Sequence, residues 1–347
     1  MNPWHIFWIR FLWSLAGFGL LIVAIIWVVD PYRNLPFSLP LDRAPAASNQ
    51  RYAYPAIARD PAFDSLMVGT STMRLIPPER LDALFDARFA NLSMNSATAY
   101  EQMRIGQLFA SHHPVARYLI VGIDIVWCED MEAPEKYTFR RFPEWMYDGN
   151  PWNDVAHLLE FKTFEVVGRQ AGYMLGLRDA RYGRDGYRSF LPPPEEYDLG
   201  KARQNIYGNP EGRPQKTEHK AAQTPGPEPV FGSHAYLKSL LRAFPPGTRK
   251  LLVFVPYHVY RQYRGNTREA RVWNACRNRV SGIAKHFENT TVLDFMITSP
   301  ITTRDENYWD PLHYSNVVAD RLAGLIARGA DGQPAPNGEY RVLFSSR

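Results

Sequence analysis

The sequence is poor in cysteine and contains no long block of like charges. Its two cysteines, Cys128 and Cys276, lie far apart, and no cluster of cysteine or histidine accompanies them, which argues against a metal site. They could pair in an oxidising compartment, but we favour the alternative that both are small buried side chains. The net charge of +5 comes from arginines spread along the chain, so the charge pattern does not indicate nucleic-acid binding.

Only one apolar run is long enough to cross a membrane. It extends over residues 11–29 without a charged residue, and at about 1.5 Å per residue it matches roughly the hydrocarbon thickness of a bilayer. Cleaved secretory signals have shorter apolar cores that are followed by small residues, whereas Asp30 follows here. We therefore predict an uncleaved signal anchor. Arg10 precedes the run, which predicts a cytoplasmic stub at residues 1–10 and the rest of the chain outside.

Short apolar runs recur beyond a proline- and alanine-rich segment at 30–60, which we interpret as a linker. Continuous apolarity without alternation is typical of strands buried on both faces of a parallel sheet. The runs are Ser65–Val68, Phe89–Leu92, Tyr118–Val126, Lys250–Val255 and Thr291–Asp294.

Helical patterns separate these runs. Pro78 lies at a first-turn position of a helix over 78–85, Thr98 and Glu101 have capping-box spacing, and Ser315 can cap a last helix. Strands alternating with helices predict an α/β fold. We expect a three-layer sandwich around a mostly parallel sheet of five strands, over residues 61–328.

The alternation fails between about 130 and 235, and we interpret this region as an insertion. Its aromatic stretch at 137–152 could stack on sugars, but we favour packing within a small core of its own. A helical piece is expected near 153–176, and the proline-rich segment at 209–229 is expected to be a mobile loop. The tail at 329–347 is also predicted to be flexible.

Hydroxyl residues follow the first predicted strand, in Gly69-Thr70-Ser71-Thr72. A side chain at the carboxyl end of a parallel strand faces the crevice where such sheets bind ligands. Near the other end of the chain, Asp310 and His313 are three residues apart, so one turn can bring both to the same side. His313 could then accept the proton of Ser71, with Asp310 orienting the imidazole.

The two blocks together resemble the SGNH (GDSL-like) hydrolase superfamily. In that family a G-x-S block ends the first strand, and a D-x-x-H block near the C-terminus completes the triad; here they read Gly69-Thr-Ser71 and Asp310-Pro-Leu-His313. The similarity covers about 62–128 and 236–328. It is closest to membrane-anchored members that act on cell-envelope polymers, such as the alginate O-acetylation and D-alanyl transfer proteins.

The resemblance implies a function and a location. The expected activity is that of a serine acyl esterase or O-acyltransferase, without cofactor, acting on an ester such as acetyl of an envelope polysaccharide. The expected location is the bacterial inner membrane, with the folded part in the periplasm and with other membrane proteins as possible partners.

Two blocks depart from the family pattern at the oxyanion hole. The second block has Ser96 where glycine is usual, although its backbone N–H could still act together with that of Ser71. The third block has Asp124 in place of asparagine, and an ionised carboxylate cannot donate a hydrogen bond. Loss of one such donor typically costs about 10²–10³ in rate. Asn95 could stand in as the missing donor.

Further residues at this edge are candidates for substrate binding. They are Thr70, Arg74, Asp124 and His258, although for Asp124 we favour a structural pairing with Arg74. The degraded oxyanion blocks also leave a rival function open, a catalytically silent binding or scaffold subunit of a polysaccharide synthesis or export complex. An anchored lipid esterase is a third hypothesis, but it would be expected to carry a long apolar lid.

Overall fold

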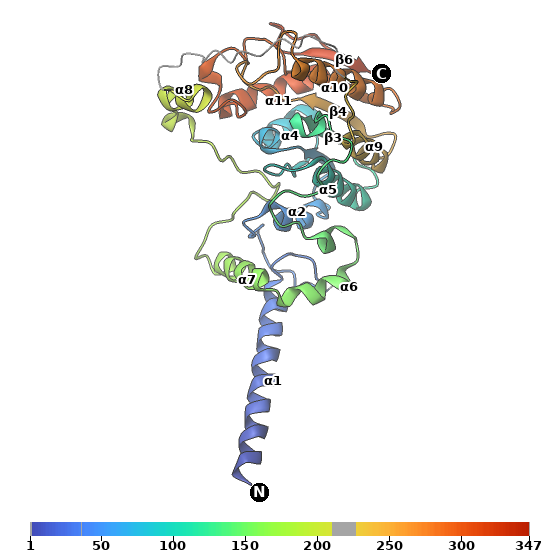
Figure 1. Cartoon of the computed structure of the whole chain (residues 1–347). Helices are drawn as coiled ribbons and strands as arrows, with labels where there is room; N and C mark the ends of the chain where they lie inside the picture. The colour runs from blue at the N-terminus through green and yellow to red at the C-terminus, as the bar shows by residue number, and fades with distance from the viewer. Residues whose placement is uncertain (1, 36, 210–226, 347) are drawn as a thin grey trace. The chain divides into compact units, whose positions relative to one another are not determined.

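The computed structural model describes residues 2–35, 37–209 and 227–346. The chain divides into two compact units, one made of residues 1–56 and 143–183, the other of residues 57–142 and 184–347 (Figure 1). The larger unit contains the sheet and all the candidate catalytic residues. Most of the predicted mobile loop at 209–229 lies outside the described residues.

A mostly parallel sheet of six strands forms the centre of the larger unit. Its spatial order is β2-β1-β3-β4-β5-β6. The first five strands are parallel, and β6 runs antiparallel to β5. The bounds are β1 Ser65–Val68, β2 Phe89–Asn91, β3 Tyr118–Ile123, β4 Arg249–Phe254, β5 Thr290–Asp294 and β6 Arg341–Ser345. The chain order reverses between β1 and β3, and such a switch point is where open α/β sheets bind ligands.

The sixth strand differs from the sequence-based prediction of five. It lies in the segment that was expected to be a flexible tail, where Val342 and Phe344 pair with Leu293 and Val292 of β5. Pairing of this kind satisfies the backbone groups at the edge of β5. Because β6 pairs with only one neighbour and its residues are largely exposed, its sequence lacks the continuous apolarity of the inner strands.

Local sequence signals explain where several helices begin. Pro78 starts α4 (Pro78–Phe85) as predicted. Thr98 and Glu101 form a complete capping box at α5 (Ala99–His112), and the Ser315 side chain accepts from Val318 N–H at α11 (Asn316–Ala330). The other helices of this unit are α3 Ser71–Arg74, α8 Leu199–Tyr207, α9 Ser233–Ala243 and α10 Arg268–Ala284, with short 3₁₀ turns at 125–127, 194–196 and 305–307. Helix α5 packs against α9, and α4 against α11.

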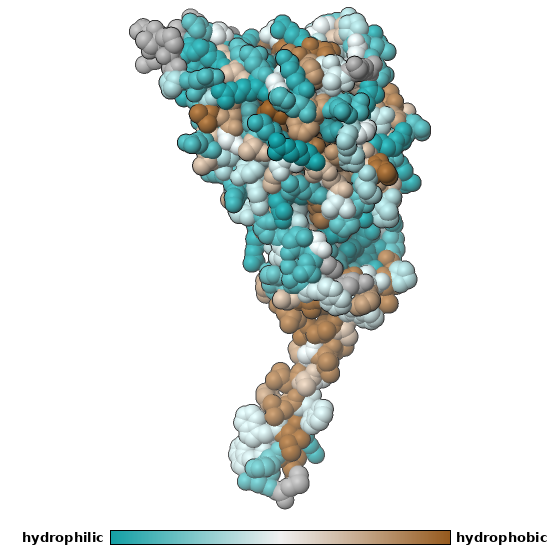
Figure 2. All heavy atoms as spheres, turned by 90° about the vertical axis from the view of Figure 1, so that its right-hand side faces the viewer, coloured by the Kyte–Doolittle hydropathy of each residue, from teal (hydrophilic) through white to brown (hydrophobic). Residues whose placement is uncertain are grey.

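The smaller unit begins with α1 (Pro3–Val29), a helix long and apolar enough to cross a membrane. Figure 2 shows hydrophobic side chains along its exposed length. The unit also contains most of α2 (Gln50–Ala58), α6 (Pro151–Asp154) and α7 (Phe161–Met174), with 3₁₀ turns at 144–147 and 155–159, the second of which is labelled η3.

Residues 30–56 pack against part of the predicted insertion. The ring of Tyr32 lies 5.7 Å from that of Trp145, and the Tyr147 hydroxyl donates to the Arg51 carbonyl at 2.8 Å. The segment interpreted as a linker is therefore largely folded. Its composition alone did not indicate this, because the residues that cover it lie about a hundred positions later in the chain.

Cys128 and Cys276 form a disulfide, with their Cα atoms 5.4 Å apart. The favoured prediction of two separate buried side chains was wrong, although both residues are indeed buried. The bond joins the segment after β3 to α10. Sequence could not decide the pairing because both interpretations require small buried side chains.

Candidate active site

Ser71 is the first residue of α3, directly beyond the carboxyl end of β1. Glycine at 69 makes this turn possible because a Cβ there would lie 2.4 Å from Cβ of Met73. Gly122 on the neighbouring strand β3 has the same role, since its Cβ would lie 2.8 Å from the same atom. The two glycines give Met73 room to pack on the sheet, and this fixes the helix that carries Ser71.

Ser71, His313 and Asp310 form a continuous hydrogen-bonded chain. Ser71 Oγ lies 2.8 Å from His313 Nε2, and His313 Nδ1 lies 2.7 Å from Asp310 Oδ2. The second contact places the proton of a neutral imidazole on Nδ1, which leaves Nε2 as the acceptor for the serine proton. The side chain of His313 is 16% exposed and that of Asp310 28%, so the three residues are held in the protein yet remain accessible.

Asp310 is held as a carboxylate by the turn that contains it. Its Oδ1 accepts the backbone N–H groups of Leu312 at 2.8 Å and His313 at 3.0 Å. Burial by itself would raise the pKa of Asp310, but the bond from the His313 ring and these two N–H groups outweigh burial, so the pKa is lowered. An ionised Asp310 can stabilise the imidazolium that forms when His313 accepts a proton.

Tyrosine and backbone contacts connect this turn to the serine. Tyr314, fully buried, donates its hydroxyl to the Thr72 carbonyl of α3 at 2.6 Å. Trp309 N–H donates to the His313 carbonyl at 2.8 Å. The tyrosine bond ties the turn to α3, 242 residues away in sequence, and the Trp309 bond closes the turn itself.

One wall of the site comes from a segment that sequence analysis did not single out. The ring of Phe190 meets the His313 ring edge-on at 5.1 Å between centroids, and the Arg74 guanidinium lies 5.0 Å from the centre of the same phenylalanine. Arg74 also donates to Asn95 Oδ1 at 2.8 Å and to the Arg188 carbonyl at 2.9 Å. No sequence pattern near Phe190 predicted its place in the site, because its proximity to His313 arises only from tertiary packing.

Asp124 lies at the end of β3 and is almost fully buried. It accepts the Thr70 hydroxyl and, at 3.3 Å, the backbone N–H of Val126. Thr70 and Val126 therefore take the place of Arg74, which was the expected partner. Burial raises the pKa of Asp124 to about 6, although the two donated hydrogen bonds oppose the rise. Its contacts are thus internal to the protein, which differs from the predicted substrate contact.

The candidate oxyanion residues lie in a turn next to β1. Met94 N–H donates to the Gly69 carbonyl at 3.0 Å, which holds this turn beside the residues preceding Ser71. Ser96 has φ 53°, a left-handed conformation that glycine adopts without strain. Asn95 directs its side-chain oxygen to Arg74, so this oxygen is engaged in the wall of the site.

His258 was a candidate for substrate binding, but it is fully buried. Tyr260 N–H donates to its Nδ1 at 3.2 Å, so the proton of the neutral ring lies on Nε2, which points to Asp305 Oδ1 at 3.3 Å. Burial lowers the pKa of His258, although Asp305 opposes the shift. The residue is therefore internal, and its role is to support the loop that leads to Asp310.

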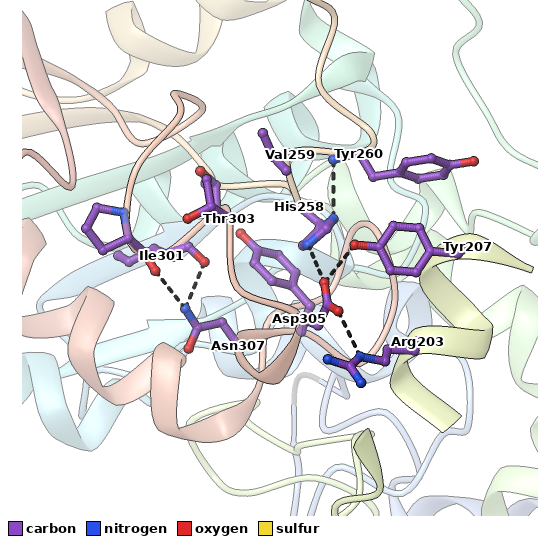
Figure 3. A network of polar contacts seen from close by, with 12 residues as sticks. Arg203, Tyr207, His258, Val259, Tyr260, Ile301, Thr303, Asp305 and Asn307 are labelled. Atoms are coloured by element: carbon purple, nitrogen blue, oxygen red, sulfur yellow. Dashed lines mark hydrogen bonds and ion pairs between the residues drawn. The ribbon is translucent and has the colours of Figure 1, made fainter. Parts of the chain in front are cut away.

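The carboxylate of Asp305 is the centre of this support (Figure 3). Tyr207 donates its hydroxyl to Oδ1 at 2.7 Å, and Arg203 donates Nε to Oδ2 at 2.9 Å. Both donors come from α8, and from the same helix Asn205 donates to the Trp309 carbonyl at 3.0 Å. The later part of the predicted insertion thus holds the loop that carries the candidate acid and base residues.

Within the described residues, no group of three or more histidine, cysteine or acidic side chains is placed to hold a metal.

A scan against protein-family models finds no match for this chain, and a search of the curated proteins finds no relative.

Proposed function

We propose that the chain is a membrane-anchored, extracytoplasmic serine esterase or O-acyltransferase of the SGNH type. The observation that carries this proposal is the chain of hydrogen bonds from Ser71 through His313 to Asp310. Its position at the switch point of the sheet is a further support. The helix pairs α5–α9 and α4–α11 are consistent with the two outer layers of a three-layer sandwich.

The proposed reaction has two halves. In the first, Ser71 Oγ attacks the ester carbonyl while His313 Nε2 takes its proton, and the departing alcohol then receives this proton, which leaves an acyl group on Ser71. In the second, water or a sugar hydroxyl gives its proton to His313 and attacks the acyl group. Ser71 recovers the proton, and either the free acid or a new ester is released.

The oxyanion formed in each half requires donors. The backbone N–H groups of Ser71 and Ser96 are the proposed ones, since Ser71 opens α3 and has no carbonyl one turn earlier in that helix. The disulfide supports an oxidising, extracytoplasmic location, and α1 supports attachment to the membrane. An acetyl ester of an envelope polysaccharide, in the periplasm, is the substrate that the motif resemblance favours.

One observation favours the rival, a binding or scaffold subunit without activity. Asp124 occupies the place of the usual asparagine, and with a pKa of about 6 it is mainly ionised at neutral pH. It then cannot donate to an oxyanion.

A serine-directed fluorophosphonate probe on the full chain in detergent separates the two proposals. We expect labelling of the wild type and of Thr72→Val, which removes the neighbouring hydroxyl, and no labelling of Ser71→Ala. Folded wild-type protein that takes no label would refute the enzyme proposal and favour the binding subunit. For a labelled protein, acetyl release from model esters with and without an oligosaccharide acceptor then distinguishes hydrolysis from transfer.

A further inference from the structure

The last turns of α1 are packed against other elements of the smaller unit. Ile26 and Val29 form a buried cluster with Val167 of α7, and partly buried apolar side chains surround them: Ile22, Leu158, Ala171 and Met174. These contacts come from α7 and from the 3₁₀ turn η3, so both elements lie beside residues 22–29 of α1. The remaining, earlier part of α1 is largely exposed.

The register of α1 fixes the depth of these contacts. Residues 11–29, at about 1.5 Å each, rise roughly 28 Å, which is close to the hydrocarbon thickness of about 30 Å. A shift that moved Arg10 into the hydrocarbon would be unfavourable, because a charged side chain is costly to place there. Trp4 and Trp8, both exposed, suit the interface at the beginning of the helix. Residues 22–29 are thus needed to complete the crossing, and they reach about 10 Å into the leaflet.

The elements packed at this depth expose apolar side chains. Along α6 and η3, Trp152, Val155 and Leu159 line one apolar pocket, and Trp152 is 64% and Leu159 61% exposed. On α7, Phe161 is 91% and Phe164 41% exposed. Such exposure of large side chains is unfavourable in water and marks an interaction surface.

Charges on α7 lie on a separate face. Glu165 pairs with Lys162 at 2.5 Å and with Arg169 at 3.1 Å, and these three residues share one side because they are three and four positions apart. Phe164 and Val167 are likewise three positions apart, so the exposed phenylalanine lies next to the residue that packs on α1. Helix α7 therefore has an apolar side that continues from α1 and a charged side, as interfacial helices have.

An apolar pocket of about 270 Å³ lies between α1 and η3. Its lining includes Val23 and Ile26 from α1, Leu158 and Leu159 from η3, and the ring of Phe37. Every lining residue is hydrophobic. Figure 2 shows hydrophobic side chains of this unit gathered next to the last turns of α1.

We propose that α6, η3 and α7 form a membrane collar, embedded beside α1 in the leaflet at its C-terminal end, with phospholipid acyl chains in the apolar pocket. The smaller unit would then hold the protein in the bilayer by more than the single helix. The occupant is lipid because the exposed apolar faces continue from α1 at the depth of the hydrocarbon.

Depth-dependent quenching in proteoliposomes tests this proposal on the full chain. One added cysteine is labelled with an NBD fluorophore at Leu159→Cys or Phe164→Cys, and the paired native cysteines do not react. Leu15→Cys on α1 is the positive control. Val115→Cys, at an apolar residue of the larger unit that is 83% exposed, is the matched negative control.

We expect lipids with a doxyl group on the acyl chain to remove most of the emission at 159, 164 and 15, and aqueous iodide to remove it only at 115. Quenching of 159 or 164 by iodide as strongly as 115 would overturn the proposal. So would protection of both sites from both quenchers, because a protein partner would then cover them. Labelling of one cysteine per chain verifies that the native disulfide is intact in each variant.

Discussion

Replacing Asp124 by asparagine is expected to stabilise the protein at neutral pH. Asp124 is almost fully buried, and burial raises its pKa to about 6 from an ordinary value of 3.8. The folded protein therefore binds a proton on the Asp124 carboxyl group more tightly than the unfolded chain does. The stability that this proton contributes is lost as the pH rises from about 4 to about 6, and the loss is complete above that range.

The size of the effect follows from the same pKa difference. A rise of about 2 in the pKa of Asp124 lowers the free energy of unfolding at pH 7 by roughly 3 kcal/mol. The asparagine amide has nearly the same shape but no charge to bury, and the Thr70 hydroxyl can turn to accept from it instead of donating. We expect Asp124→Asn to gain up to about 3 kcal/mol at pH 7, equivalent to roughly 6–12 °C in Tm, and to gain nothing near pH 4.

The assay is thermal unfolding of the full chain in detergent, followed by circular dichroism between pH 4 and 7. Other carboxyl groups with raised pKa values, such as Asp185 and Asp294, titrate in both proteins, so the difference between variant and wild type is the relevant quantity. Asp179→Asn, at an exposed position, controls for the lost charge. A difference in Tm that is constant with pH, or a variant less stable at pH 7, would refute the reasoning.

The same variant tests the oxyanion argument. An amide at 124 has two N–H donors, one for the Thr70 hydroxyl and one for an oxyanion, so we expect fluorophosphonate labelling of Ser71 to become faster, by up to about 10²-fold. A gain in stability without any change in labelling rate would show that residue 124 does not reach the oxyanion.

Two further predictions concern the residues that support the site. Asp310→Asn is expected to fold normally but to lower the turnover of a model ester by about 10⁴-fold, because the amide favours the wrong imidazole tautomer; ester hydrolysis measured from pH 5 to 9 is the check, and an unchanged rate would contradict the assignment. Tyr207→Phe removes a hydroxyl that donates to the Asp305 carboxylate, which is expected to cost about 1.5–3 kcal/mol. Faster hydrogen exchange confined to residues 299–313 would support that role, and unchanged exchange there would contradict it.

The sequence predicted several elements from signals within one or two turns. The bounds of α4, the capping box of α5 and the serine cap of α11 agree with the structure, because a helix end is decided by residues three or four positions apart. The parallel strands were visible because burial on both faces makes their runs continuously apolar. Ser71, Asp310 and His313 were predicted from the hydroxyl turn after a strand, the three-residue spacing of Asp310 and His313, and the family resemblance of the two blocks. The structure brings them within hydrogen-bond distance.

Other features depended on partners that no local pattern specifies. His258 follows a parallel strand as predicted, but Asp305 and the tyrosines around it bury the ring and remove it from the substrate side. The same is true of Phe190 beside His313. Each contact joins segments about fifty or more residues apart, so the sequence near either residue does not predict the contact.

The sequence by itself determined the apolar first helix, the α/β class, the helix ends and the three residues of the candidate triad. Tertiary structure alone decided the antiparallel sixth strand, the disulfide, the folding of residues 30–56 with 143–183, and the partners of Asp124. The physical reason is the range of the interactions. Caps and periodic burial act within a turn of the chain, whereas strand pairing at an edge, cysteine pairing and the burial of a carboxylate depend on which distant segments pack together.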